Sequence, residues 1–261
     1  MPGPFLTLAR RLGLTTFRRL GLTTFQRLGL TAGRCPVCGS LAEADAALCA
    51  ACAAALPLRR GGFCPACGEM SGREADPPSR CPECRLEPPP WESLHFHGRY
   101  SGLMRDLIVG YKFRNRFDHN RLLGAMAVST FETHGGRLPD IIIPVPLHAR
   151  RLTWRGFNQS VEIARGLGSR LKRPVLLHAL ERTRNTPPQT RLGLKERQTN
   201  IRGAFKADPA LVKGKVALLV DDVYTTGSTL REGARTLRGA GCTGVDVLVL
   251  ARAQREPDQV Y

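Results

Sequence analysis

The stretch KVALLVDDVYTTGSTL, Lys215 to Leu230, decides the fold of this chain. Its apolar run, Val216 to Val220, is typical of a strand that is buried on both faces, and two adjacent acids, Asp221 and Asp222, follow directly. In open α/β sheets, ligands bind beyond the carboxyl ends of the strands. The stretch therefore predicts a ligand site at the end of a central strand.

A hydroxyl-rich loop follows the acids and leads into a predicted helix, 228–240. Backbone N–H groups and hydroxyls at a helix N-terminus can surround a phosphate, whereas carboxylates suit the hydroxyls of a sugar. Tyr224 is interpreted as a loop position that tolerates many side chains. The alternative is a helix that is merely capped after a strand. We predict a site for a phosphorylated ribose, with these residues in contact: Asp221, Asp222, Thr225, Thr226, Gly227, Ser228 and Thr229.

Strand-like and helical patterns alternate after the proline run 88–90. This alternation predicts an α/β domain, 91–261, with a mostly parallel sheet flanked by helices. In RGFNQS (155–160), Asn158 is a plausible cap for the helix 158–171. The other expected elements are a helix at 228–240 and strands at 140–146, 173–180, 215–223 and 244–252.

The formal net charge of +17 favours phosphate-bearing partners, either phosphorylated metabolites or nucleic acid. Solubility alone is the plainer explanation of this charge. No apolar run approaches the ~20 residues of a membrane span, and the N-terminus lacks the pattern of a signal peptide. We therefore expect no membrane insertion and a cytoplasmic location. Residues 1–34 contain the repeat RLGLT, starting at 11, 19 and 27, and are interpreted as a basic low-complexity tail.

Eight of the nine cysteines form four CxxC pairs within the segment 35–90. Tight CxxC turns aim two thiolates at one ion, so two pairs make a tetrahedral zinc site. Disulfides would need an oxidising compartment. We predict a double zinc-ribbon module with two structural Zn²⁺ ions, in which the pairing is either sequential or interleaved. The predicted ligands are Cys35, Cys38, Cys49, Cys52, Cys64, Cys67, Cys81 and Cys84.

The opening stretch resembles the 5-phosphoribosyl-1-pyrophosphate (PRPP) motif of type I phosphoribosyltransferases. The resemblance implies that the acids hold the ribose hydroxyls, that the loop holds the 5-phosphate, and that Mg²⁺ accompanies PRPP. The segment 141–151, IIIPVPLHARR, looks like that family's first core strand and pyrophosphate loop, and 183–203 looks like its mobile loop. The residues implied are His148, Arg150, Arg151 and Arg155 for phosphates, and Gln189, Arg191, Arg197 and Asn200 in the mobile loop.

Three further segments, 100–116, 144–165 and 182–205, resemble the ComF family. That family places a cysteine-paired zinc module before a phosphoribosyltransferase-like domain, and it is associated with DNA uptake during natural competence and with single-stranded DNA. The resemblance implies PRPP, single-stranded DNA and DNA-uptake proteins as partners. Lys112, in the string YKF, looks like a family position that could reach a phosphate.

Two functions from different classes stay open at this point. One is a PRPP-binding protein that works in DNA uptake, and the other is an active phosphoribosyltransferase of nucleotide salvage with a nitrogen acceptor and no DNA role. An enzyme of this kind works by positioning and charge stabilisation, so no catalytic nucleophile is assigned. In type I phosphoribosyltransferases, a segment outside the core sheet, called the hood, selects the acceptor. The resemblance and the position of the zinc module make that module the candidate for the hood.

Overall fold

The computed structural model describes residues 33–43, 48–113, 119–184 and 201–254. They divide into two compact units, the first ending at Ala55 and the second beginning at Leu56. The first unit contains the earlier two CxxC pairs and one short helix, α3 (Ala50–Ala54). The second unit contains the later two pairs and the α/β domain.

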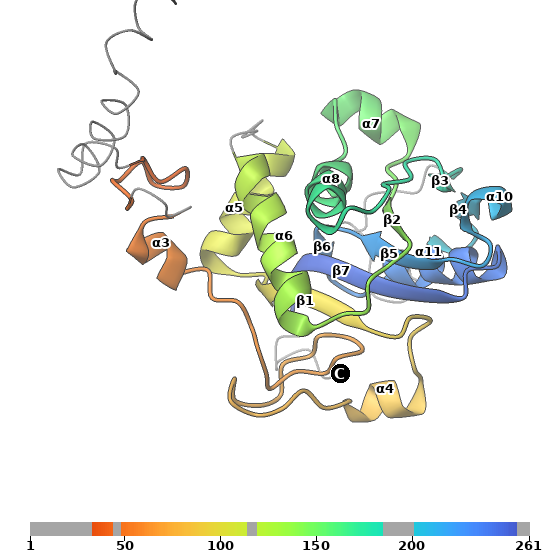
Figure 1. Ribbon diagram of the computed structural model, residues 1–261, viewed down its shortest axis with the longest axis horizontal. Coiled ribbons are helices and arrows are strands. Elements are labelled where there is room, and N and C mark those ends of the chain that lie inside the picture. The colour runs from red at the N-terminus through yellow and green to blue at the C-terminus, as the bar shows by residue number, and fades with distance from the viewer. Residues whose placement is uncertain (1–32, 44–47, 114–118, 185–200, 255–261) are drawn as a thin grey trace, which may run out of the picture. The chain divides into compact units, whose positions relative to one another are not determined.

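The large unit is built on a sheet with strand order β1–β7–β5–β2, and β6 pairs with β7 (Figure 1). Each of the described pairs in this sheet is parallel, which confirms the predicted α/β class. The predicted strands at 140–146, 215–223 and 244–252 all lie in it. The observed strands are β1 (Leu94–Arg99), β2 (Ile141–Pro144), β5 (Val216–Val220), β6 (Val223–Tyr224) and β7 (Gly244–Arg252).

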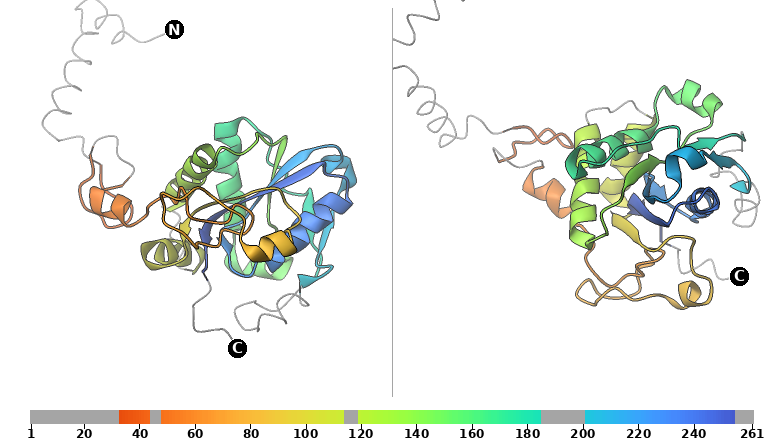
Figure 2. Two further views of the ribbon diagram at one scale, coloured as in Figure 1. Left: turned by 90° about the horizontal axis from the view of Figure 1, so that it is seen from below. Right: turned by 45° about the vertical axis from the view of Figure 1, so that its right-hand side comes forward.

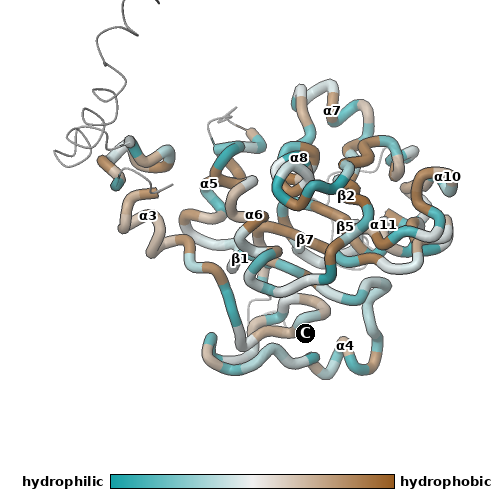
Figure 3. The backbone as a smooth tube through the Cα atoms, viewed as in Figure 1, coloured by the Kyte–Doolittle hydropathy of each residue, from teal (hydrophilic) through white to brown (hydrophobic). Residues whose placement is uncertain are grey.

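The apolar runs that predicted β5 and β7 are explained by burial on both faces of the sheet. All nine residues of β7 are buried, as are the last four of β5. Figure 3 shows β2, β5 and β7 as hydrophobic stretches at the centre of the large unit. Because a parallel sheet is covered by other elements on both sides, its strands are continuously hydrophobic rather than alternating.

Helices α6 (Asn120–His134) and α8 (Gln159–Leu171) cover one face of the sheet (Figure 2). Asn158 caps α8 as predicted, because its side-chain oxygen accepts a hydrogen bond from the backbone N–H of Ser160 at 3.0 Å. The two helices approach closely where two glycines meet. A Cβ on Gly166 would lie 3.3 Å from the Cα of Gly124, so this crossing depends on small residues.

Helix α11 (Ser228–Gly239) covers the opposite face and presents Leu230, Ala234 and Leu237 to the core. The later cysteine pairs share this core, since Cys64, Cys67 and Cys84 are buried against the same strands. The remaining elements are α4 (Pro82–Leu86), α5 (Gly102–Phe113), α7 (Ala149–Arg155), α10 (Pro209–Val212), and a two-stranded antiparallel sheet of β3 (Leu180–Arg182) and β4 (Phe205–Ala207).

The predicted strand at 173–180 is wrong. Only Val175 forms a bridge, to Ile142 of β2, and the chain then turns until β3 begins at Leu180. Pro174 has no N–H to donate, and Leu177 is exposed, so the segment runs along the edge of the sheet instead of through it. The prediction failed because the apolar residues of this segment have the sequence pattern of a buried strand.

Within the described parts of the chain, none of the helices is long and apolar enough to cross a membrane.

Candidate functional site

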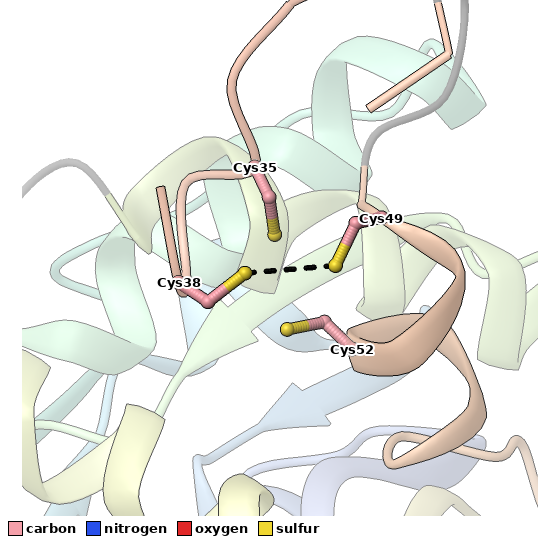
Figure 4. A group of neighbouring side chains, drawn as sticks. All are labelled: Cys35, Cys38, Cys49 and Cys52. Carbon is pink, nitrogen blue, oxygen red and sulfur yellow. Dashed lines mark hydrogen bonds between the residues drawn. The ribbon is translucent and has the colours of Figure 1, made fainter. Parts of the chain in front are cut away.

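The cysteines gather in two separate groups of four, in chain order. Each group brings its four sulfurs within 4.8 Å of one another. Figure 4 shows the first group, with the sulfurs of both CxxC pairs turned toward a common centre. The pairing that the sequence left open is therefore sequential. The groups are Cys35, Cys38, Cys49 and Cys52 in the small unit, and Cys64, Cys67, Cys81 and Cys84 in the large unit.

The geometry of both groups fits a tetrahedral zinc ion. The sulfurs of Cys38 and Cys49 lie 3.5 Å apart, and those of Cys67 and Cys81 lie 3.7 Å apart. Zn–S bonds of ~2.3 Å in a tetrahedron place neighbouring sulfurs about 3.8 Å apart, whereas a disulfide needs about 2.05 Å. All of these thiols are free. The donor set therefore suits Zn²⁺, and both of these sulfur separations are too long for a disulfide bond.

Both groups begin with the same turn, in which the glycine after the second cysteine donates its N–H to the carbonyl of the first. Gly39 donates to Cys35 at 2.9 Å, and Gly68 donates to Cys64 at 2.8 Å. Both glycines have positive φ, at 76° and 71°, a conformation that other residues rarely adopt. The hydrogen bond between the thiols of Cys64 and Cys67 lowers the pKa of Cys64 and raises that of Cys67, so the two sulfurs share one proton-holding contact.

The turn of the second group, 64–68, is fastened to the sheet through its carbonyls. The indole N–H of Trp91 donates to Ala66 at 2.7 Å, and the backbone N–H of Leu94 donates to Pro65 at 2.9 Å. The Nε of Arg252, at the end of β7, donates to the carbonyl of Cys67 at 2.7 Å. This turn, which we call the core knuckle, is therefore part of the large unit's core.

The two acids follow β5 and have different partners. Asp221 Oδ1 accepts a hydrogen bond from Ser160 Oγ at 2.9 Å and another from the backbone N–H of Asp222, also at 2.9 Å. Asp222 Oδ2 lies 2.7 Å from the Nζ of Lys112, which α5 brings from more than a hundred residues away in sequence. The lysine expected to reach a phosphate therefore contacts the acid expected to hold a ribose hydroxyl.

Burial, reinforced by the neighbouring charge of Asp222, raises the pKa of Asp221 to about 7. Lys112 and the hydrogen bonds from Ser160 and the Asp222 backbone act in the opposite direction. An aspartate near neutrality can hold or release a proton as a ligand arrives. A strongly shifted carboxyl at the end of a sheet strand is also a recognised sign of a functional site.

The loop 225–229 turns at Gly227, whose φ is 76°. A Cβ at this position would lie 2.4 Å from the hydroxyl of Tyr224, so glycine is required for space as well as for conformation. Thr226 Oγ1 and Ser228 Oγ lie 2.9 Å apart at the start of α11. The backbone N–H groups and hydroxyls of the loop therefore meet at one helix N-terminus, the arrangement that suits a phosphate.

Tyr224 is buried, which makes the interpretation of a tolerant loop position wrong. It packs edge-on against Trp91 with ring centroids 6.2 Å apart, and the guanidinium of Arg252 lies 4.4 Å from its ring centre. Arg252 also donates to the carbonyl of Thr225 at 3.0 Å. The same arginine thus holds the core knuckle and the first residue of the loop.

Of the predicted phosphate-contacting residues, three lie on the short helix α7 and the fourth caps it. The ring Nδ1 of His148 accepts the backbone N–H of Arg150 at 3.3 Å. Burial lowers the pKa of Arg155, while the nearby carboxylates of Asp222 and Asp221 raise it. Burial also lowers the pKa of Arg151. The charge of Arg155 interacts with both acids, and Arg151 lies near Arg155 and Arg182, whereas Arg150 is exposed.

One basic residue near the site was not singled out from the sequence. Burial lowers the pKa of Arg182 to about 10, and its charge interacts with Arg151 and Asp221. It is the last residue of β3 and comes just before the segment predicted as a mobile loop. Its place at the start of the string RTRN is the sequence signal that could have identified it. The predicted loop residues Gln189, Arg191, Arg197 and Asn200 lie outside the described residues.

Comparison with known proteins agrees with this arrangement. Residues 124–261 match the phosphoribosyl transferase domain family. Competence protein F of Haemophilus influenzae is 34% identical over 229 residues, covering 84% of this chain and 97% of that protein. DNA utilization protein YhgH of Escherichia coli K12 is 35% identical over 209 residues, covering 78% and 90%. Competence protein ComFC of Bacillus subtilis is 26% identical over 214 residues, covering 77% and 82%.

The parallel sheet, together with the domain match, gives the chain a type I phosphoribosyltransferase fold preceded by a cysteine-rich module, as predicted. The similarity to competence protein F spans most of both proteins. The chain belongs to the ComF family, which confirms the resemblance seen in its sequence.

Proposed function

We propose that this protein binds PRPP at the acidic end of β5 and acts in DNA uptake, where it contacts single-stranded DNA. The observation that carries the proposal is the meeting of Asp221 and Asp222 with the hydroxyl loop 225–229 at one strand end. The names of the relatives, a competence protein and a DNA utilization protein, support the role in DNA uptake.

Each group has a chemical task in this proposal. The two carboxylates accept hydrogen bonds from the ribose hydroxyls, and the loop N–H groups hold the 5-phosphate at the start of α11. Arg151 and Arg155 are assigned to the pyrophosphate, because guanidinium groups make strong and directional hydrogen bonds to phosphate oxygens. Mg²⁺, which prefers oxygen ligands, would bind together with PRPP and neutralise its phosphates.

The ion pair between Lys112 and Asp222 has a direct consequence for binding. The Nζ of Lys112 lies 2.7 Å from Asp222 Oδ2, the oxygen that would accept a hydrogen bond from a ribose hydroxyl. PRPP therefore has to share Asp222 with Lys112 or displace it toward a phosphate. Lysine suits such a movement, since its charge is carried on a flexible stem.

The experiment measures PRPP binding and pyrophosphate release on the same preparation, with and without Mg²⁺. We expect wild type to bind PRPP and Asp222→Asn to lose most of the affinity. Asp106→Asn, which changes an exposed carboxyl on α5, is the matched control and should bind like wild type. Equal PRPP affinity in wild type and Asp222→Asn would contradict the proposal.

Salvage catalysis is the second candidate. It is favoured by two arginines whose charges interact with the acids, Arg155 and Arg182, because they could stabilise the departing pyrophosphate. Pyrophosphate release that requires a nitrogen acceptor and Asp222, in a protein that binds no DNA, would establish this candidate. Binding of a labelled single strand that weakens steeply with salt would favour the role in DNA uptake.

A further inference from the structure

Exposed hydrophobic side chains gather at one place on the large unit. Trp154 is 72% exposed and Phe113 is 56% exposed. The rings of Phe113 and Trp154 have centroids 6.4 Å apart, although they belong to different helices, α5 and α7. We call these two residues the aromatic rim. Exposed aromatic clusters of this kind mark binding surfaces rather than packing surfaces.

The aromatic rim is surrounded by positive charge. Helix α7, with the sequence ARRLTWR, carries three arginines and no acid. The guanidinium of Arg155 lies 5.0 Å from the ring centre of Phe113, and its Nη1 donates to Gln159 Oε1 at 2.8 Å, which fixes it over the ring. The rim therefore combines the exposed ring of Trp154 with the charges that a phosphate backbone needs.

The aromatic rim adjoins the predicted PRPP site. Phe113 follows Lys112 directly, and the Nζ of Lys112 contacts Asp222 at 2.7 Å. Arg155, which stacks on Phe113, interacts with the carboxylates of both acids. Figure 1 shows α7 standing beyond the end of β2, the strand next to β5.

We propose that the aromatic rim is a stacking site for the bases of single-stranded DNA, with the arginines of α7 on the phosphate backbone. This inference rests on the proposed function and gives its DNA contact a location. A free base that accepts a ribosyl group needs an enclosed pocket that excludes water, but Trp154 is 72% exposed. Duplex DNA is also excluded as the occupant, because its bases stack on one another and offer no free face.

The chain offers a direct optical test, because it contains only two tryptophans. Trp91 is 3% exposed and its indole N–H is bonded to Ala66, so it is shielded from a bound strand. Trp154 is exposed and can contact a bound strand. We expect a dT12 oligonucleotide to quench the fluorescence of Trp154, and the quenching to disappear in Trp154→Phe while that variant still binds the strand.

Affinity for dT12, measured by anisotropy at several salt concentrations, separates stacking from charge. Trp154→Ala should weaken binding about 5- to 150-fold, the loss expected for one stacked base, without changing the salt slope. Arg150→Ala should reduce the salt slope by about 0.7, the contribution of one phosphate contact on a single strand. Leu138→Ala, which changes a hydrophobic residue that is 52% exposed elsewhere, is the matched control and should bind like wild type.

PRPP affinity is measured on the same variants, since Trp154→Ala should leave it unchanged. If wild type binds the strand and Trp154→Ala binds it equally well, the rim is not the stacking site, and the proposed function stands. If wild type binds no single strand, both are refuted. Quenching by the mononucleotide dTMP as strong as by dT12, or loss of PRPP binding in Trp154→Ala, would make the rim a small-nucleotide site and overturn the inference.

Discussion

Replacing Arg252 by Met should disconnect the core knuckle from the PRPP loop. The side chain is 4% exposed and donates to the carbonyls of Cys67 and Thr225 at 2.7 and 3.0 Å. It also pairs with Glu69 at 3.2 Å and lies over the ring of Tyr224. Met fills much of the same space but donates no hydrogen bond, so both carbonyls lose their charged donor.

The magnitude follows from these contacts. A hydrogen bond from a charged group contributes about 1.5–3 kcal/mol, so losing two should lower the free energy of unfolding of Arg252→Met by about 3–6 kcal/mol. For a unit of this size, each kcal/mol corresponds to about 2–4 °C in Tm, which gives a fall of roughly 6–24 °C. Since Thr225 begins the loop, PRPP affinity should fall as well.

The assay is thermal unfolding followed by circular dichroism, together with zinc content and PRPP binding. Arg170→Met is the matched control, because Arg170 pairs with Glu132 on the surface, where the two side chains are 62% and 45% exposed. Such a pair contributes only about 0–1 kcal/mol. If Arg252→Met lowers Tm no more than Arg170→Met does, the reasoning is wrong.

Three other predictions concern the same site and its support. Lys112→Met should cost about 2–3 kcal/mol, and much of this should return in the double variant with Asp222→Asn, because the buried acid is then neutral; additive losses in urea unfolding would contradict the pairing. The pKa of Asp221 is raised to about 7 in the folded state and is near 3.9 unfolded, so wild type loses stability as pH rises from about 4 to 7. Over that pH range, the free energy of unfolding of Asp221→Asn should rise relative to wild type by on the order of 2–4 kcal/mol, measured by urea unfolding. A difference that does not depend on pH would contradict the raised pKa of Asp221. Cys84→Ser should lower the Tm of the large unit, whereas Cys52→Ser should not, because only the former thiol lies in the sheet's core; equal Tm values would contradict this.

The features that sequence predicted best are local ones. The apolar run before Asp221, the glycine at 227 and the cysteine spacing are each written in a few consecutive residues, and the structure shows the expected strand, turn and thiol groups. The phosphate and ribose contacts stay predictions. Local patterns succeed because a strand end or a CxxC turn is determined by its own backbone.

The features that sequence missed depend on residues far apart in the chain. Nothing near Lys112 or Ser160 shows that they meet the acids, because α5 and α8 bring them there. The burial of Tyr224 depends on Trp91 and Arg252. Likewise, the aromatic rim forms only because α5 and α7 place two exposed rings side by side. The low aromatic content of the chain, 6%, gave no indication of it.

The position of the core knuckle bears on how the chain can be shortened. A recombinant piece starting at Trp91 would keep every strand of the parallel sheet but would lose Phe63 and the buried cysteines that cover Leu94 and Phe96. The apolar face left open would favour aggregation of that piece. A piece starting at Leu56 retains the whole layer, and it is therefore the shorter form to express for crystallisation and for ligand screening.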